Sequence, residues 1–344
     1  MRAASRAAPA RVALPRVAGR RISIHIGHQK CASTTLQAAL FANLEALRRR
    51  GAVVADEQLG FPLEGPLGGP PTFYVDRMCD REEDGLHEAV ARLHEAVRGL
   101  PEQVDHLIVS AESLTRPRAE FFAKALAHAY RVEVIYYVRR PQDFLVSAWA
   151  QWGCLKGLPL RAFVEHEFGL ARPDYLAVAE RWAAHAASCH VAPLHPSALR
   201  GGDVVQDFFA ALGYPDLEVA APPPQNVMLD WSLLEVFADC PFLFQDIHDT
   251  ALGDWLKQMV KQEAERPLLA GDLVAEIAAR YDESNRRLHA RFFPDVDFDA
   301  ALATRINDCA PTRTAEEEQQ AEMARLRRAV GVQLELARRL QQDA

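Results

Sequence analysis

The stretch from residue 22 to 54 constrains the fold of this chain more than any other. Ile22–Ile26 alternates apolar and polar residues and contains β-branched side chains, which predicts a strand. From residue 34 to 50 leucines recur at helical spacing, and three arginines followed by Gly51 predict the end of that helix. Ala52–Val54 then predicts a second short strand. A strand, a helix and another strand in close succession are typical of a parallel βαβ unit.

The same alternation continues along the chain. Val132–Val138 is almost continuously apolar, as a central parallel strand must be. Further strands are predicted at 106–110 and 189–194, and further helices at 81–99, 119–130, 141–152, 173–187 and 203–212. Residues 57–74 are rich in glycine and proline and predict an irregular loop, and the chain beyond Pro222 is mainly helical in pattern. We therefore expect a three-layer α/β/α fold with a mostly parallel central sheet and a helical C-terminal region.

Length and patterning suggest three parts. The 344 residues suffice for one large α/β domain with a helical appendage. Residues 1–20 carry five arginines and no acid, and we expect a disordered basic extension there. Residues 21–300 are the expected α/β domain, helical from about residue 222 onward. Residues 301–344 end in a charged amphipathic helix, which we interpret as a lid or an oligomer contact; the oligomeric state stays open.

Composition excludes several classes of partner. The formal net charge of −8 gives no general attraction to nucleic acid or to an anionic membrane, so an anionic ligand needs a local basic pocket. We expect no integral membrane segment, because no apolar run approaches the roughly 18 residues that a spanning helix needs. The six cysteines are scattered, without CxxC pairs or metal-ligand spacing, which favours reduced thiols, a cytoplasmic location and no bound metal.

The loop between the first strand and the first helix, residues 27–36, reads GHQKCASTTL. A helix start suits an anion because its first N–H groups are unpaired and the helix dipole is positive there. Lys30 adds a full charge, and the following Ser and Thr residues add hydroxyl donors. The spacing differs from the GxxxxGK[ST] loop of nucleoside triphosphatases. The alternative is an N-cap cluster that only satisfies backbone donors.

This loop resembles the 5′-phosphosulfate loop of the sulfotransferases that use 3′-phosphoadenylyl sulfate (PAPS), which reads roughly PK[ST]G[ST][ST] after a strand. The matching residues are Lys30, Ser33, Thr34 and Thr35, and the positions that differ are Gln29, Cys31 and Ala32. The resemblance implies that the segment from Lys30 through Cys31 and Ala32 to Thr35 binds the nucleotide in a P-loop-type fold. Alanine in place of glycine fits if φ at Ala32 is negative.

A second motif follows the apolar run at 132–138. Arg139 stands at the predicted carboxyl end of that strand, where open α/β sheets bind ligands. Arg139, Pro141, Asp143 and Ser147 reproduce the R-x-P-x-D-x-x-x-S segment with which PAPS sulfotransferases bind the 3′-phosphate. The resemblance thus assigns Arg139 and Ser147 to the 3′-phosphate, with Arg140 expected to face solvent. Taken alone, Arg139 could equally form a structural ion pair.

Two residues are candidates for a general base. Glu112 follows the strand predicted at 106–110, and His28 lies inside the phosphate loop. Each has a simpler alternative: Glu112 could form a salt bridge, and His28 could be a capping or exposed histidine. We interpret the chain as a PAPS-dependent sulfotransferase in which Lys30 stabilises the leaving group and Glu112 or His28 deprotonates a hydroxyl or amine.

Two rival interpretations remain. A kinase that uses ATP requires the GK[ST] sequence that this loop lacks, and a non-catalytic nucleotide- or glycan-binding module would keep the fold without turnover. The sequence does not identify the acceptor, which could be a carbohydrate, a lipid or a small metabolite.

Overall fold

The computed structural model describes residues 19–220, 229, 231–259, 269–306 and 314–342. The predicted basic extension at 1–20 therefore lies outside the described residues, apart from Gly19 and Arg20. Its predicted disorder and the three-part domain division remain predictions.

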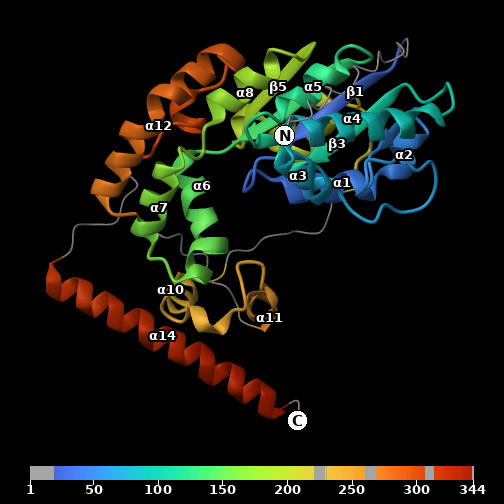
Figure 1. The fold of residues 1–344 in the computed structure, drawn as a ribbon. Helices are drawn as coiled ribbons and strands as arrows, with labels where there is room; N and C mark the ends of the chain where they lie inside the picture. The colour runs from blue at the N-terminus through green and yellow to red at the C-terminus, as the bar shows by residue number, and fades with distance from the viewer. Residues whose placement is uncertain (1–18, 221–228, 230, 260–268, 307–313, 343–344) are drawn as a thin grey trace, which may run out of the picture. The chain divides into compact units, whose positions relative to one another are not determined.

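The chain builds a five-stranded, all-parallel sheet between layers of helices, so the predicted α/β/α fold is confirmed (Figure 1). The order in the sheet is β2-β3-β1-β4-β5. The strands are β1 (Arg21–Ile26), β2 (Ala52–Val54), β3 (His106–Ala111), β4 (Arg131–Val138) and β5 (Ser188–Pro193).

Helices alternate with the strands and then follow one another without strands. Those of the alternating part are α1 (Ser33–Ala42), α2 (Leu44–Arg48), α3 (Thr72–Asp80), α4 (Glu82–Arg98), α5 (Glu120–Leu126), α6 (Pro141–Ala148), α7 (Leu160–Gly169), α8 (Tyr175–Ala183) and α9 (Val204–Ala211). The later ones are α10 (Trp231–Asp239), α11 (Ala251–Met259), α12 (Gly271–Phe292), α13 (Phe298–Ala301) and α14 (Ala315–Gln342).

The strand order creates a switch point at β1. From β1 the chain continues to β2 at one edge, whereas from β3 it crosses β1 to form β4 on the other side. Loops that leave the carboxyl ends of two such neighbouring strands diverge and leave room for a ligand between them. The phosphate loop follows β1 and Arg139 follows β4, so both predicted motifs leave the sheet at this switch point.

Two predicted helices differ from the structure, and two helices were not predicted, one of them α3, which begins inside the loop expected at 57–74. The helix expected at 34–50 is divided into α1 and α2, because Asn43 adopts a non-helical conformation with φ −116° and ψ 17°. The helix expected to reach Trp152 ends at Ala148 and continues as a π-helical turn, Trp149–Gly153. Helix α7 was not predicted, although Leu160, Phe163 and Val164 have helical spacing.

The chain divides into two compact units. The first unit comprises the described residues up to Ile26, residues 43–135 and residues 181–189. The second unit comprises residues 27–42, 136–180 and the described residues from 190 onward. Both motif segments, 27–36 and 139–147, belong to the second unit.

A buried polar ladder crosses the strand pair of the first unit. β1 and β3 pair in parallel from Arg21 with His106 to Ile26 with Ala111. On one face, His25 Nδ1 lies 2.8 Å from Ser110 Oγ, and His106 Nε2 lies 2.8 Å from Ser23 Oγ. All four of these side chains are buried, so each serine hydroxyl satisfies a ring nitrogen that water cannot reach.

The second unit has an extensive apolar core. Phe144, Trp149, Phe163, Leu234 and Ile277 are all buried in one cluster that joins α6, α7, α10 and α12. This packing fixes the position of α6, which begins at Pro141, two residues after Arg139. Within the described ranges, we find no helix with the length and apolar character that a membrane crossing requires.

Candidate anion-binding site

The loop after β1 folds into a concave turn. Lys30 and Ala32 have positive φ, +63° and +62°, whereas Cys31 between them does not. Successive residues of opposite φ sign turn their N–H groups toward a common side, which is the geometry of an anion-binding nest. The first N–H groups of α1, which begins at Ser33, extend this row because a helix leaves them unpaired.

The loop is closed by hydrogen bonds to a single carbonyl. The N–H of Cys31 donates to the carbonyl oxygen of His28 at 3.0 Å, and the Ser33 hydroxyl donates to the same oxygen at 2.9 Å. The hydroxyl proton of Ser33 is thus engaged inside the loop. The Cys31 side chain is fully buried, and its sulfur lies 4.0 Å from the Tyr175 hydroxyl. It therefore packs the loop against the protein interior.

The condition that φ at Ala32 be negative is not met. Its φ of +62° is the left-handed conformation that glycine adopts most readily. For a residue with a Cβ atom, this conformation costs about 1–2 kcal/mol. The loop therefore keeps a glycine-type backbone although alanine occupies the position.

An aromatic cluster lies beneath the loop. The His28 ring contacts Tyr175, Phe144 and Tyr136, with ring centroids 5.0, 5.4 and 6.0 Å away. The Tyr136 hydroxyl lies 3.0 Å from His28 Nδ1, within hydrogen-bond distance. Sequence reasoning missed these supporting aromatics, because they come from β4, α6 and α8 and only the fold brings them together.

The cluster has an electrostatic consequence for His28. Burial and, to a smaller extent, the nearby positive charge of Arg172 lower the pKa of the His28 imidazole to about 3. The ring is therefore neutral at physiological pH. An imidazole with so low a pKa is a weak proton acceptor, which disfavours His28 as a general base.

Lys30 lies beside an aromatic ring. Its Nζ atom is 5.6 Å from the ring centroid of Trp152, a cation–π distance. Trp152 belongs to the π-helical turn that follows α6. The side chain of Lys30 is half-buried. The contact with Trp152 keeps its ammonium group next to the loop.

Arg139 reaches the lysine loop. Its Nη1 donates a hydrogen bond to the backbone carbonyl oxygen of Lys30 at 3.3 Å, across 109 positions of sequence. A guanidinium group has five N–H donors, so this bond leaves others to bind an anion. The two predicted motifs thus meet within the second unit.

Arg140 does not face solvent as we expected. Its side chain is 3% exposed and donates hydrogen bonds to the carbonyl oxygens of Ala300 and Ala303, and Nη1 lies 3.6 Å from the Asp143 carboxylate. The prediction failed because these acceptors lie some 160 positions away in sequence. Arg140 therefore anchors the end of α13 to the start of α6.

The remaining predicted residues occupy separate positions. Ser147 is half-buried in the last turn of α6, and Thr34 and Thr35 lie in the first turn of α1 with Thr34 exposed. Glu112 belongs to the first unit, where it opens a short 3₁₀ turn after β3, and its N–H donates to Thr72 Oγ1 at 3.4 Å. Its role as a base therefore stays a prediction.

Comparisons with protein-family models, curated proteins and solved structures give no match.

Proposed function

We propose that this protein is a sulfotransferase that moves a sulfuryl group from 3′-phosphoadenylyl sulfate to a hydroxyl or amine acceptor. One observation carries the proposal: Arg139 Nη1 lies 3.3 Å from the carbonyl oxygen of Lys30. Two cationic segments from distant parts of the sequence are adjacent in one compact unit. A nucleotide with phosphates on both its 5′ and 3′ sides is a ligand that uses both.

The loop supplies the 5′-phosphate site. The N–H groups at the start of α1 and the hydroxyl groups of Thr34 and Thr35 donate to the phosphate oxygens. Ser33 contributes its backbone N–H, because its hydroxyl proton is used to close the loop on His28. Arg139, with Ser147 on the following helix, binds the 3′-phosphate.

Transfer is an in-line displacement with little covalent work for the protein. The acceptor oxygen or nitrogen forms a bond to sulfur while the bond from sulfur to the bridging phosphate oxygen breaks, which leaves adenosine 3′,5′-bisphosphate. Lys30 neutralises the negative charge that grows on that bridging oxygen, and a base takes the acceptor proton. Because the pKa of His28 is lowered to about 3, His28 is disfavoured as that base, and Glu112 stays the other candidate that the sequence suggests.

Two rivals are less well supported. A kinase that uses ATP requires a GK[ST] sequence in its phosphate loop, which this chain lacks. Such a kinase would also have no evident use for Arg139. A non-catalytic module draws its support from two replacements in the loop, Gln29 for proline and Ala32 for glycine. The positive φ at Ala32 weakens the second of these arguments, because the loop keeps its glycine-type conformation with alanine in place.

Titration calorimetry and a transfer assay test the proposal. We expect adenosine 3′,5′-bisphosphate to bind at least about tenfold more tightly than ATP, with or without magnesium, since only the former has a 3′-phosphate. Labelled donor offered to a panel of sugars, lipids and small metabolites then reports transfer. Equal affinity for the two nucleotides would refute the two-phosphate site, and tight bisphosphate binding without transfer to any acceptor would favour the module.

A further inference from the structure

Helix α14 has an exposed apolar stripe along one side. Met323, Leu326 and Val330 are 45%, 46% and 52% exposed, and they follow one another at intervals of three and four residues. Residues at this spacing lie on the same side of a helix, about one turn apart. A row of large apolar side chains in water is unfavourable, and such a row is typical of a contact surface.

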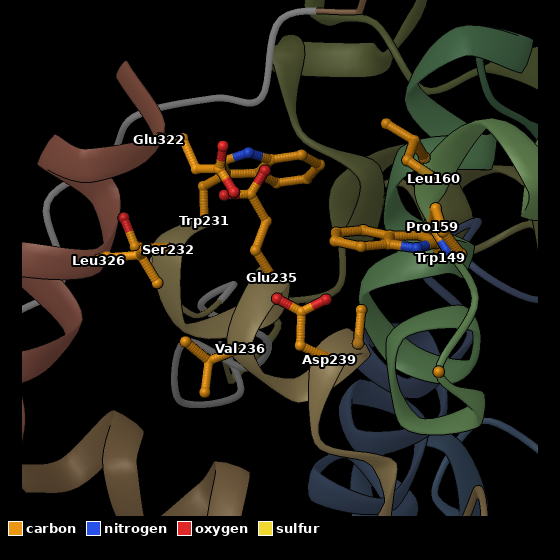
Figure 2. A pocket seen from close by; sticks show the side chains of 12 residues that line it. Trp149, Pro159, Leu160, Trp231, Ser232, Glu235, Val236, Asp239, Glu322 and Leu326 are labelled. Atoms are coloured by element: carbon orange, nitrogen blue, oxygen red, sulfur yellow. The ribbon is translucent and has the colours of Figure 1, made fainter. Parts of the chain in front are cut away.

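A different side of α14 packs on the second unit. Val332 packs against the apolar core that includes α10. Glu322 and Leu326 line the cavity that α14 forms with α10, so Leu326 lies at the border between the two sides (Figure 2). Because each residue advances a helix by about 100°, Met323 and Val330 lie nearly opposite Val332. The core therefore accounts for one side of the helix and leaves the stripe exposed.

The stripe is the centre of a longer heptad pattern. Six exposed residues of α14 follow one another at intervals of 4, 3, 4, 3 and 4, namely Gln319, Met323, Leu326, Val330, Gln333 and Ala337. This alternation keeps one seam of a helix facing a neighbouring helix, as in coiled coils.

The pattern is symmetric about position 328, so it suits a second copy of the same helix that runs in the opposite direction. In that register, position 326 of one copy lies opposite position 330 of the other, 323 lies opposite 333, and 319 lies opposite 337. Every position of the seam thus meets a position of the seam in the other copy. A twofold axis through the middle of the helix pair produces such a self-complementary contact.

The charges along α14 favour the same direction. From 316 to 322 the sequence has four glutamates and no basic residue, whereas from 325 to 339 it has five arginines and one glutamate. In an antiparallel pair, the acidic part of each helix lies beside the basic part of the other. A parallel pair would bring like charges together, which is unfavourable.

We infer that two copies of this chain form a homodimer by antiparallel pairing of their α14 helices, with Met323, Leu326 and Val330 at the centre of the contact. Of the two roles that the sequence suggests for this helix, a lid and an oligomer contact, the inference selects the second. It does not depend on the sulfotransferase proposal.

Sedimentation equilibrium of the full-length protein tests the dimer. We expect dimers at about 100 µM protein, and we expect an increase in salt from about 50 to 500 mM to raise the dissociation constant at least about threefold, because salt screens the attraction between opposite charges. A protein that is only monomeric at this concentration would overturn the inference. If salt strengthens the dimer or leaves it unchanged, the antiparallel direction is wrong.

Substitutions locate the contact. Val330→Glu places a charge in the seam and should raise the dissociation constant at least about tenfold. Ala324→Glu adds the same charge at an exposed position of α14 outside the seam and should change the constant less than about twofold. Met323→Gln removes apolar surface from the seam without a new charge and should also weaken the dimer. Circular dichroism checks that each variant is folded. Equal dimerisation of wild type, Val330→Glu and Met323→Gln would place the contact on another surface and overturn the inference.

Discussion

The guanidinium group of Arg139 donates a hydrogen bond from Nη1 to the backbone carbonyl oxygen of Lys30, 3.3 Å away. The bond joins the segment after β4 to the loop after β1, at the place where the strand order changes direction. It also fixes the arginine next to the lysine loop before any ligand arrives. A site prepared in this way loses less entropy on binding.

Substitution of Arg139 should reduce affinity for the 3′-phosphate. Arg139→Gln removes a charged donor, and we expect affinity for adenosine 3′,5′-bisphosphate to fall about tenfold to a hundredfold, the equivalent of about 1.5–3 kcal/mol. Affinity for adenosine 5′-monophosphate, which has no 3′-phosphate, should change much less. Calorimetry with both nucleotides measures the difference. An equal loss of affinity for both nucleotides would show that Arg139 stabilises the loop conformation and does not bind the 3′-phosphate.

The adjacent arginine provides a control. Arg140→Gln also removes one positive charge, but its guanidinium is buried and bonded to the carbonyl oxygens of Ala300 and Ala303. Its loss leaves buried acceptors unsatisfied, and we expect the free energy of unfolding to fall by about 3 kcal/mol. Arg139→Gln should cost much less stability, because Arg139 is only half-buried. Denaturant titrations of both variants check the contrast.

Removal of the lysine charge should affect turnover more than binding. Lys30→Ala keeps the Cβ atom, so the backbone at φ +63° experiences the same steric restriction as in the wild type. We expect kcat for sulfuryl transfer to fall about 10²–10³-fold, because the charge is needed most when the bridging oxygen becomes negative. Bisphosphate affinity should fall less. If kcat is unchanged while affinity falls, Lys30 acts in binding alone.

Position 32 offers a test of backbone strain. Ala32→Gly relieves a left-handed alanine, φ +62°, and should stabilise the protein by about 0.5–1 kcal/mol after the larger chain entropy of glycine in the unfolded state is included. The same substitution at Ala38, inside α1, should destabilise it by about 1 kcal/mol. Opposite shifts in the denaturation midpoint would confirm the strain. A loss of stability at both positions would contradict it.

Sequence patterns predicted the α/β fold and the positions of both motifs in it, because each of these follows from the pattern of neighbouring residues. The apolar run of β4 read correctly because a central parallel strand is buried on both faces. β1 was recognised from its alternating, β-branched residues, although its polar residues Ser23 and His25 are buried as well. The loop from residue 27 to 36 was found because a lysine and hydroxyl groups at a helix start form a contiguous pattern.

Features that depend on distant residues could not be predicted. Arg140 is buried because two carbonyl groups near residue 300 accept its hydrogen bonds. The sequence around Arg140 does not predict these distant acceptors. The positive φ at Ala32 depends on the closure of the loop on the carbonyl of His28. The aromatic support of His28 likewise comes from three separate elements, so it appears only after the chain has folded.

Buried histidines should make the protein sensitive to acid. Burial lowers the pKa values of His25, His28 and His106 to about 3 each, with the charge of Arg172 contributing at His28 and that of Arg21 at His106. In the unfolded chain these three imidazoles become protonated near the ordinary histidine pKa of about 6.5. In the folded protein they stay neutral. The free energy of unfolding therefore keeps its full value above about pH 6.5 and decreases as the pH falls from about 6.5 toward 3.

The size of the effect can be measured. Each such histidine adds to the pH dependence of the free energy of unfolding, by at most about 1.4 kcal/mol per pH unit where it is protonated in the unfolded chain and neutral in the folded one. Denaturant titrations between these pH values measure the slope. His106→Asn, which retains a polar partner for Ser23, should reduce the slope, because one of the three buried histidines is removed. His87→Asn alters an exposed histidine of α4 and should leave the slope unchanged. Equal slopes for wild type and His106→Asn would show that His106 is protonated to the same extent in the folded and unfolded states, which its burial against Ser23 argues against.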